Sequence, residues 1–208
     1  MPSNIPFIDK IKLMNAQLST IAPGSYPLNK LDICPKNPVY TVIYFPGCIN
    51  KYVNPSVANA AISILTENNC RIYIPDELLC CGMPAQTSGA TEVAKKLAVH
   101  NIHKLLDTPS LDIDYIVVDC GSCSYMLKTY EELLSENVEL AEKGAMLKDK
   151  IIDLNQFLLK LNIKLPQNKE KIKVTYHDPC HLRRSQGIYK EPRALVQKIK
   201  NVHFVEMD

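Results

Sequence analysis

The chain has 208 residues, of which 46% are apolar and 22% are charged, and its formal net charge is +2. This composition supports a packed globular core and argues against global disorder. Basic and acidic residues are mixed along a nearly neutral chain, so nothing predicts nucleic acid or an anionic membrane surface as a partner.

The sequence contains no run of 18 apolar residues, and residues 1–12 lack the apolar region of a secretory signal. We therefore expect no membrane span and a cytoplasmic location. Thiols stay reduced in that compartment. The eight cysteines are then better explained by metal ligation or redox chemistry than by a disulfide framework.

The predicted elements begin after residues 1–40, which contain six prolines and are interpreted as an extension or linker with a short helix near residues 8–18. Three runs of strand character follow, at 41–45, 71–74 and 115–118. Amphipathic patterns predict helices at 55–65, 91–105, 122–134 and 151–161. This alternation predicts an α/β fold with a parallel, Rossmann-like sheet.

Five cysteines follow the three predicted strands. Cys48 comes after the first strand, Cys80 and Cys81 after the second, and Cys120 and Cys123 after the third. The carboxyl ends of parallel strands meet at one edge of a sheet, where open α/β folds gather their sites. We therefore expect these five thiols to converge.

The adjacent pair Cys80-Cys81 is the most specific feature of this set. Two neighbouring thiolates repel each other unless positive charge lies between them, and a polynuclear centre of soft metal ions supplies that charge. Zinc is an alternative, although a tetrahedral zinc site takes four ligands rather than five. Two further alternatives are a thioredoxin-like use of Cys120-Gly-Ser-Cys123 and thiols that are simply buried in the core.

The pattern restarts near Val174. Tyr176-His-Asp-Pro-Cys180 echoes Tyr44-Phe-Pro-Gly-Cys48, and each follows a short strand. Cys80 lies 32 residues after Cys48, and the same offset from Cys180 is position 212, beyond the last residue. We therefore expect a second unit that is incomplete, as in a truncated or split product. His177 and His181 are interpreted as turn residues rather than ligands.

Two cysteines fall outside the pattern. Cys70 precedes a strand at the opposite edge and is interpreted as a core residue, and Cys34 as a surface thiol.

At these residues the sequence resembles the CCG cysteine-rich domain family. The resemblance rests on Phe45-Pro-Gly-Cys48, Cys80-Cys-Gly-Met-Pro-Ala85, Cys120-Gly-Ser-Cys123 and His177-Asp-Pro-Cys-His-Leu182, and it covers about residues 40–208. It implies a first CCG domain at 41–165 and an incomplete second one at 166–208. The family includes heterodisulfide reductase B and the iron–sulfur subunits of glycolate oxidase and lactate utilisation systems.

The resemblance implies that a [4Fe-4S] cluster, of the noncubane type, is held by Cys48, Cys80, Cys81, Cys120 and Cys123. It further implies that Cys180 is the first ligand of a second site whose other ligands are missing from the sequence. The expected role is electron transfer from a flavoprotein that oxidises a 2-hydroxy acid, beside a ferredoxin-type iron–sulfur subunit, in a multi-subunit oxidoreductase that is membrane-associated only through partners. The alternatives are disulfide reduction at the cluster and a zinc-stabilised module without enzymatic activity.

Overall fold

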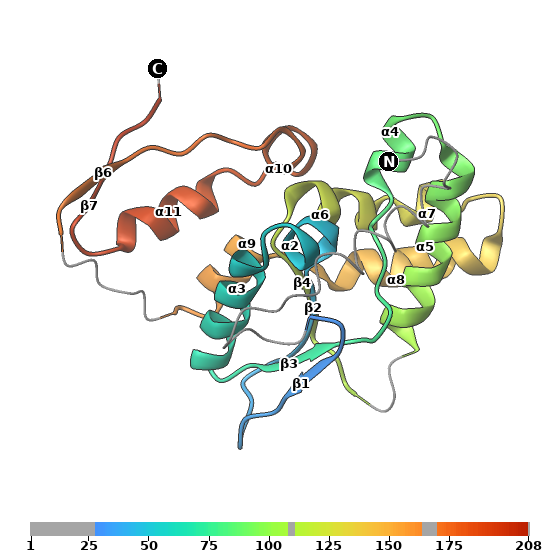
Figure 1. The fold of residues 1–208 in the computed structure, drawn as a ribbon, viewed down its shortest axis with the longest axis horizontal. Helices are drawn as coiled ribbons and strands as arrows, with labels where there is room; N and C mark the ends of the chain where they lie inside the picture. The colour runs from blue at the N-terminus through green and yellow to red at the C-terminus, as the bar shows by residue number, and fades with distance from the viewer. Residues whose placement is uncertain (1–27, 108–110, 164–169, 208) are drawn as a thin grey trace.

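The computed structural model describes residues 28–107, 111–163 and 170–207 (Figure 1). The main sheet has five strands in the spatial order β1-β3-β2-β4-β5. Their bounds are β1 Leu31–Ile33, β2 Thr41–Phe45, β3 Arg71–Ile74, β4 Tyr115–Val118 and β5 Ile151–Asp153. Strands β2 to β5 pair in parallel, whereas β1 pairs antiparallel with β3. The predicted α/β class with a mainly parallel sheet is confirmed.

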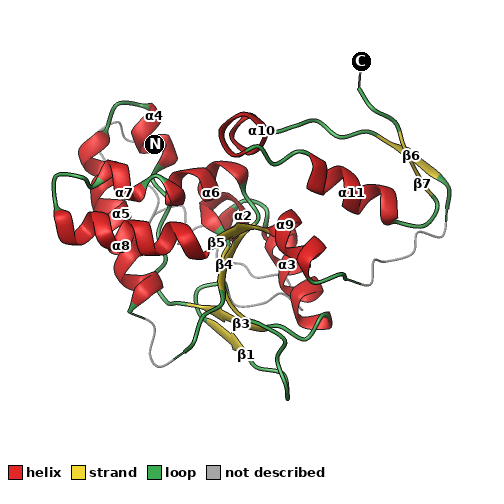
Figure 2. Cartoon of the chain, turned by 180° about the vertical axis from the view of Figure 1, so that it is seen from behind, coloured by secondary structure: helices red, strands yellow, loops and turns green. Residues whose placement is uncertain are grey.

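Helices cover both faces of this sheet. Helices α3 and α9 lie on one side, and α5 and α8 on the other, as the views from front and back agree (Figures 1 and 2). The helices of this part are α2 Gly47–Tyr52, α3 Pro55–Glu67, α4 Met83–Thr87, α5 Thr91–Leu106, α6 Gly121–Lys128, α7 Tyr130–Leu133, α8 Val138–Lys150 and α9 Leu154–Lys160. Because both faces are covered, the central strands are apolar throughout, and residues 42–45 of β2 are fully buried.

Two predicted stretches differ in the structure. Residues 31–33, which the sequence placed in the extension, form the edge strand β1, with Leu31 opposite Ile74. The helix predicted over 151–161 is split, because Ile151 joins the sheet opposite Ile116 and helix α9 begins only at Leu154. The helix predicted near residues 8–18 lies outside the described residues.

The strand order creates a point where the chain changes direction across the sheet. From β2 the chain crosses to β3 on one side, and it then returns to β4 on the other side of β2. At such a switch point the loops after the two central strands diverge and leave room for a site. Cys48 follows β2 and Cys120 follows β4, so these two cysteines flank the switch point.

A second, smaller unit repeats the beginning of the first. It contains β6 Ile172–Val174, α10 Cys180–Gln186, α11 Lys190–Lys198 and β7 Val202–Phe204. Thr41 pairs with Arg71 in the first unit and Ile172 with Val202 in the second, so the parallel partners are 30 residues apart in both. The two units therefore share one supersecondary arrangement, while the domain boundaries at 40 and 165 stay a prediction.

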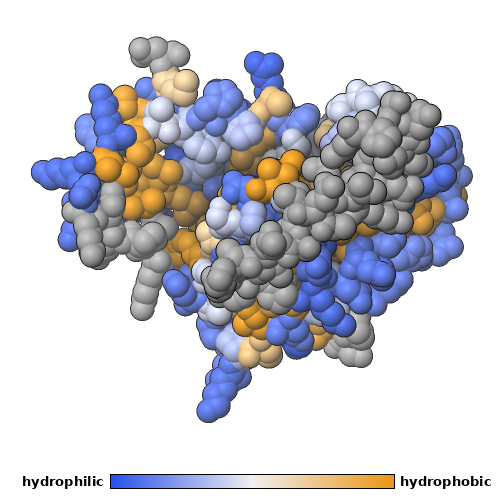
Figure 3. Space-filling model, viewed as in Figure 1, coloured by the Kyte–Doolittle hydropathy of each residue, from blue (hydrophilic) through white to orange (hydrophobic). Residues whose placement is uncertain are grey.

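The strands of the second unit are much more exposed than those of the first. Ile172 of β6 is 42% exposed, whereas Val42 of β2 is fully buried. In the view of Figure 3, apolar side chains gather on the surface of the lobe that carries β6, β7 and α11. The unit packs on the first through its helices, α10 against α6 and α11 against α9.

No helix in the described ranges is long and apolar enough to cross a membrane.

Candidate metal centre

Cys48 lies in the first turn of α2, directly after the central strand β2. The chain turns there at Gly47, whose φ of +65° is a left-handed conformation that glycine adopts without strain. A Cβ atom on Gly47 would lie 2.9 Å from the sulfur of Cys123. The backbone after β2 therefore approaches the thiol of a helix more than 70 residues away in the chain.

Cys80 and Cys81 lie in the loop between β3 and α4, and each is only 2% exposed. Gly82 follows them with a φ of +95° and begins the turn into α4. The N–H of Gly82 hydrogen-bonds the Cys80 sulfur, and the N–H of Met83 hydrogen-bonds the Cys81 sulfur. The loop thus wraps its own amide groups around the adjacent thiols.

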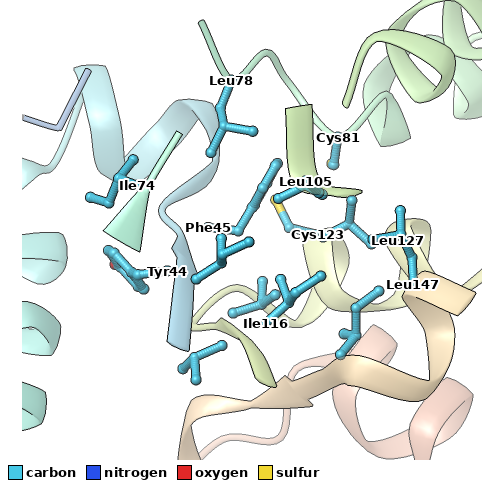
Figure 4. Packing of buried hydrophobic residues seen from close by; sticks show 14 of the residues in the cluster. Tyr44, Phe45, Ile74, Leu78, Cys81, Leu105, Ile116, Cys123, Leu127 and Leu147 are labelled. Carbon is cyan, nitrogen blue, oxygen red and sulfur yellow. The ribbon is translucent and has the colours of Figure 1, made fainter. Parts of the chain in front are cut away.

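Cys120 and Cys123 lie at the amino end of α6, with Cys120 as the N-cap and Cys123 in the first turn. The hydroxyl of Tyr44 donates to Asp119 at 2.6 Å and so ties the end of β2 to the end of β4. Figure 4 shows Cys123 beside Phe45 and Leu127 in the packed core. Cys123 is 6% exposed, so its thiol is largely sealed from water, whereas Cys120 is half-buried.

The five thiols form one continuous run of side-chain contacts. The Cys48 sulfur lies 3.6 Å from the Cys80 sulfur. Cys80 contacts Cys81, Cys81 contacts Cys123, and Cys123 contacts Cys120 through further thiol hydrogen bonds. The structure therefore brings together all five cysteines that the strand pattern placed at one edge.

Within this run the thiols differ in acidity. Hydrogen bonds from Cys123 and Cys80 lower the pKa of Cys81, and a hydrogen bond from Cys123 lowers the pKa of Cys120 to about 6. The amide N–H groups of Ser122 and Cys123 add to the effect at Cys120. Hydrogen bonding to their neighbours and burial raise the pKa of Cys48 and Cys123. The hydrogen bonds within the run thus favour the ionised form of Cys81 and Cys120 and the protonated form of Cys48 and Cys123. Metal binding would displace the remaining thiol protons.

The donor set itself fits soft metal ions. Thiolates are soft ligands, and a group of five cysteines, three of them buried and two half-buried, matches the chemistry of iron–sulfur clusters better than that of hard cations. Among the described residues, no three Cys, His, Asp or Glu side chains surround one point as the ligands of a single metal ion would. Each of the five sulfurs contacts the next in a line, and they do not surround one common point.

The sixth predicted ligand is placed apart from this group. Cys180 is exposed at the start of α10 and lines an open hollow of about 750 Å³ with Arg183, Arg184 and Arg193. His181 stacks on Tyr125 with ring centroids 5.5 Å apart. Cys34 is exposed and Cys70 is buried, in line with their interpretation as a surface and a core thiol.

A small hollow adjoins the thiols at Cys48 and Cys80. It measures about 10 Å³ and is also lined by Lys51 and Tyr52. Burial lowers the pKa of Lys51 to about 8. A volume of this size holds about one water molecule.

Two residues that sequence reasoning did not assign to the site hold its loop in place. Asn101 of α5 is fully buried and donates to the Cys80 carbonyl at 3.0 Å. Tyr130 of α7, also fully buried, donates to the Cys81 carbonyl at 2.8 Å. A sequence signal existed for Asn101, because it falls at core spacing between Leu97 and Leu105 on the apolar face of its helix.

The second unit also reaches the CxxC helix. Ser122 lies 2.9 Å from the Nδ1 atom of His181. The side chain of Gln186 donates to the Gly121 carbonyl at 3.1 Å and to the Ser124 hydroxyl at 2.9 Å. The turn interpretation of His181 therefore misses its contact with Ser122 in the first turn of α6.

Comparison with known families gives the fold and the cysteines a common context. The family model of the CCG cysteine-rich domain matches residues 42–128 and 174–208, more than half of the chain and every site cysteine. The chain belongs to the CCG cysteine-rich domain family. The two matched segments correspond to the first unit and to the repeated second unit of the fold.

Several curated relatives of the chain are iron–sulfur proteins or oxidoreductase subunits by name. The probable glycolate oxidase iron–sulfur subunit of Bacillus subtilis is 33% identical over 170 residues, 80% of this chain and 37% of the relative. Lactate utilization protein A of Shouchella clausii is 31% identical over 170 residues, 80% of this chain and 68% of the relative. A fumarate reductase (CoM/CoB) subunit of Methanothermobacter marburgensis is 31% identical over 173 residues, 83% of this chain and 32% of the relative.

The chain spans about a third of the length of several of these relatives. No solved structure matches the chain.

The acidity of Cys120 gives a prediction for the metal-free protein. Because its pKa is lowered to about 6, Cys120 is a thiolate above that pH and becomes protonated below it. Alkylation of Cys120 by iodoacetamide should therefore rise between about pH 5 and 7 and change little above. Mass spectrometry after timed alkylation measures this rate.

Cys70 is the matched control, because burial raises its pKa to about 11 and keeps it protonated throughout this range. A rate at Cys120 that is still rising steeply between about pH 7 and 9 would contradict the assignment of a thiolate there.

Proposed function

We propose that this chain is an iron–sulfur electron-transfer unit in which Cys48, Cys80, Cys81, Cys120 and Cys123 hold a [4Fe-4S] cluster. The observation that carries the proposal is the continuous run of contacts between these five thiols at the switch point of the sheet. Membership of the CCG family and the names of the relatives support an iron–sulfur centre.

When bound, the cluster would accept and release single electrons. The protein's own contribution is to bury the thiols and to supply amide donors to them. Burial excludes water, and N–H groups directed at ligand sulfurs stabilise their negative charge. In this chain the donors are Gly82 and Met83 at the adjacent cysteines, and Ser122 at the CxxC helix.

The electrons would come from a flavin-dependent dehydrogenase of a 2-hydroxy acid of the glycolate or lactate type. The names of the Bacillus and Shouchella relatives support this choice. The chain would act within a multi-subunit oxidoreductase, beside a flavoprotein subunit and a ferredoxin-type iron–sulfur subunit. Its location would be cytoplasmic, with any membrane association made through those partners.

Electron transfer is favoured over disulfide reduction because the Bacillus and Shouchella relatives carry the names of a glycolate oxidase iron–sulfur subunit and a lactate utilization protein. A turnover assay with reduced viologen and a small disulfide distinguishes the two functions. We expect no turnover above that of the Cys81→Ser variant.

The cluster is tested by metal analysis. The chain is purified and reconstituted without oxygen, and its iron, sulfide and zinc are measured before an EPR spectrum is recorded. We expect iron and sulfide in equal amounts and an EPR spectrum that changes when the protein is reduced. Stoichiometric zinc without iron would support the zinc-stabilised module instead and would overturn the proposal.

The flavin partner needs a separate test. The iron-loaded chain is mixed with the purified flavin dehydrogenase and its 2-hydroxy acid, and bleaching of the cluster absorbance is followed by stopped flow. Reduction that depends on both the acid and the flavoprotein is expected. Reduction by the acid alone, or none with either glycolate or lactate, would contradict this source of electrons.

Gly47 offers a test of the close approach between the two halves of the site. In the Gly47→Ala variant the new methyl group would meet the Cys123 sulfur at 2.9 Å, on a residue with a φ of +65°. We expect iron per chain to fall severalfold, together with a loss of about 1 kcal/mol in the free energy of unfolding. Iron analysis and urea denaturation measure the two effects.

The control is Gly89→Ala, because Gly89 has a similar φ of +78° and no atom near its added Cβ. That variant should lose a similar amount of stability and keep its iron. Equal iron loss in both variants would show that backbone strain, rather than contact with Cys123, is responsible.

A further inference from the structure

The carbonyl groups of the adjacent cysteines are held from behind by two buried side chains. The Tyr130 hydroxyl donates to the Cys81 carbonyl at 2.8 Å, and Asn101 Nδ2 donates to the Cys80 carbonyl at 3.0 Å. Asn101 Nδ2 also donates to the Tyr130 hydroxyl at 3.2 Å, and its Oδ1 accepts from the Leu79 N–H at 3.0 Å. One connected network thus fixes the peptide groups around Cys80 and Cys81.

The Cys81 carbonyl belongs to the same peptide group as the Gly82 N–H. Since that group is planar, its C=O and N–H point in opposite directions. Tyr130 holds the oxygen on one side, and the N–H on the other side hydrogen-bonds the Cys80 sulfur. The Tyr130 hydroxyl therefore decides where the Gly82 N–H points, although it touches no sulfur itself.

Burial makes this arrangement rigid and costly to break. Asn101 and Tyr130 are both fully buried. Loss of the Tyr130 hydroxyl would leave the Cys81 carbonyl without its side-chain donor in a dry environment. Once that hydrogen bond is lost, the peptide between Cys81 and Gly82 can rotate. Gly82 now has a left-handed φ of +95°, and a glycine also adopts other backbone angles without strain.

We infer that Tyr130, supported by Asn101, is a positioning residue that aims the Gly82 N–H at the Cys80 sulfur and thereby sets the reduction potential of the centre. This role rests on the proposed function. Hydrogen bonds to ligand sulfurs stabilise the reduced, more negative state of an iron–sulfur centre. A freed peptide would withdraw that stabilisation.

The test compares the iron-loaded chain with its Tyr130→Phe variant, which removes one hydroxyl and keeps the ring. The midpoint potential is measured by an EPR-monitored redox titration. We expect a shift to more negative potential that corresponds to about a tenfold change in the equilibrium with a one-electron donor, or about 59 mV. Hydrogen exchange at the Gly82 amide, read by fragmentation mass spectrometry, should become at least about tenfold faster.

Two controls separate positioning from general destabilisation. Tyr115→Phe removes a hydroxyl that contacts Lys160 near the amino end of β4, the opposite edge of the sheet from the thiols. Ile62→Val trims a fully buried side chain in α3. Both variants should keep the potential and the Gly82 exchange rate of the unaltered chain.

An unchanged potential together with unchanged Gly82 exchange in a fully loaded Tyr130→Phe protein would overturn the inference and leave the proposed function standing. If the variant does not fold, exchange in the unaltered chain decides. We then expect the Gly82 amide hydrogen to exchange as slowly as the amide hydrogens of the sheet core. Exchange as fast as in an exposed loop would overturn the role of Tyr130. If the unaltered chain takes up no iron, the proposed function fails, and the same exchange measurement still tests whether the peptide is held.

Discussion

Replacement of Cys81 by serine should remove most of the iron from the reconstituted protein. Cys81 is the middle member of the thiol run and contacts both Cys80 and Cys123. Hydrogen bonds from Cys123 and Cys80 lower its pKa, which favours the thiolate form that a soft metal ion binds, and it is 2% exposed. A serine hydroxyl is a hard, protonated donor that cannot replace a soft thiolate. We expect at least a tenfold drop in iron per chain, measured by atomic emission together with the loss of visible absorbance.

Cys34→Ser is the matched control for this experiment, because it makes the same chemical change at an exposed thiol outside the run. That variant should keep its full iron content. Retention of iron in Cys81→Ser, with an unchanged EPR spectrum, would show that Cys81 is not a ligand.

The Gly144→Ala variant should be less stable than the unaltered chain, although alanine is the better helix former by about 1 kcal/mol. A Cβ atom on Gly144 would lie 2.6 Å from the Glu131 nitrogen and 3.0 Å from the Tyr130 carbonyl carbon. These are backbone atoms, which cannot rotate away, so α7 and α8 must separate. We expect a net loss of about 2 kcal/mol in the free energy of unfolding, measured by urea denaturation.

Met146→Ala serves as the control on the same helix, because Met146 is 57% exposed. Its effect should stay within about 0.5 kcal/mol. An increase in stability for Gly144→Ala would mean that the close packing of α7 on α8 is absent in solution. The position of Tyr130 behind the Cys81 carbonyl would then lose its support.

The sequence by itself determined the fold class and the grouping of the thiols. Buried parallel strands need apolar residues on both faces, so 115–118 could be recognised as a short apolar run, and 41–45 by its β-branched and aromatic residues. Parallel strands also share one carboxyl edge, so the position of a cysteine relative to its strand predicts which others it meets. For this reason Cys48, Cys81 and Cys120 could be placed together without coordinates.

Local pattern could not supply the remaining features. Ile151 fits the apolar spacing of the following helix, yet pairing with Ile116 draws it into β5, and Asp153 caps α9 by accepting from the Asn155 N–H at 2.9 Å. Strand pairing outweighs helical spacing at that position because it satisfies backbone groups that would otherwise be buried without partners.

Only the tertiary structure decided how the thiol loop is held. Asn101 and Tyr130 lie 20 or more residues from Cys81 in the chain, and their spacing is that of ordinary core residues. Their role depends on two side-chain hydrogen bonds to backbone carbonyl groups. Every residue carries such a carbonyl, so the sequence cannot indicate which carbonyl a given side chain will meet. The residue types determined where the sulfurs gather, and the packing of α5 and α7 determined which way the peptides between them point.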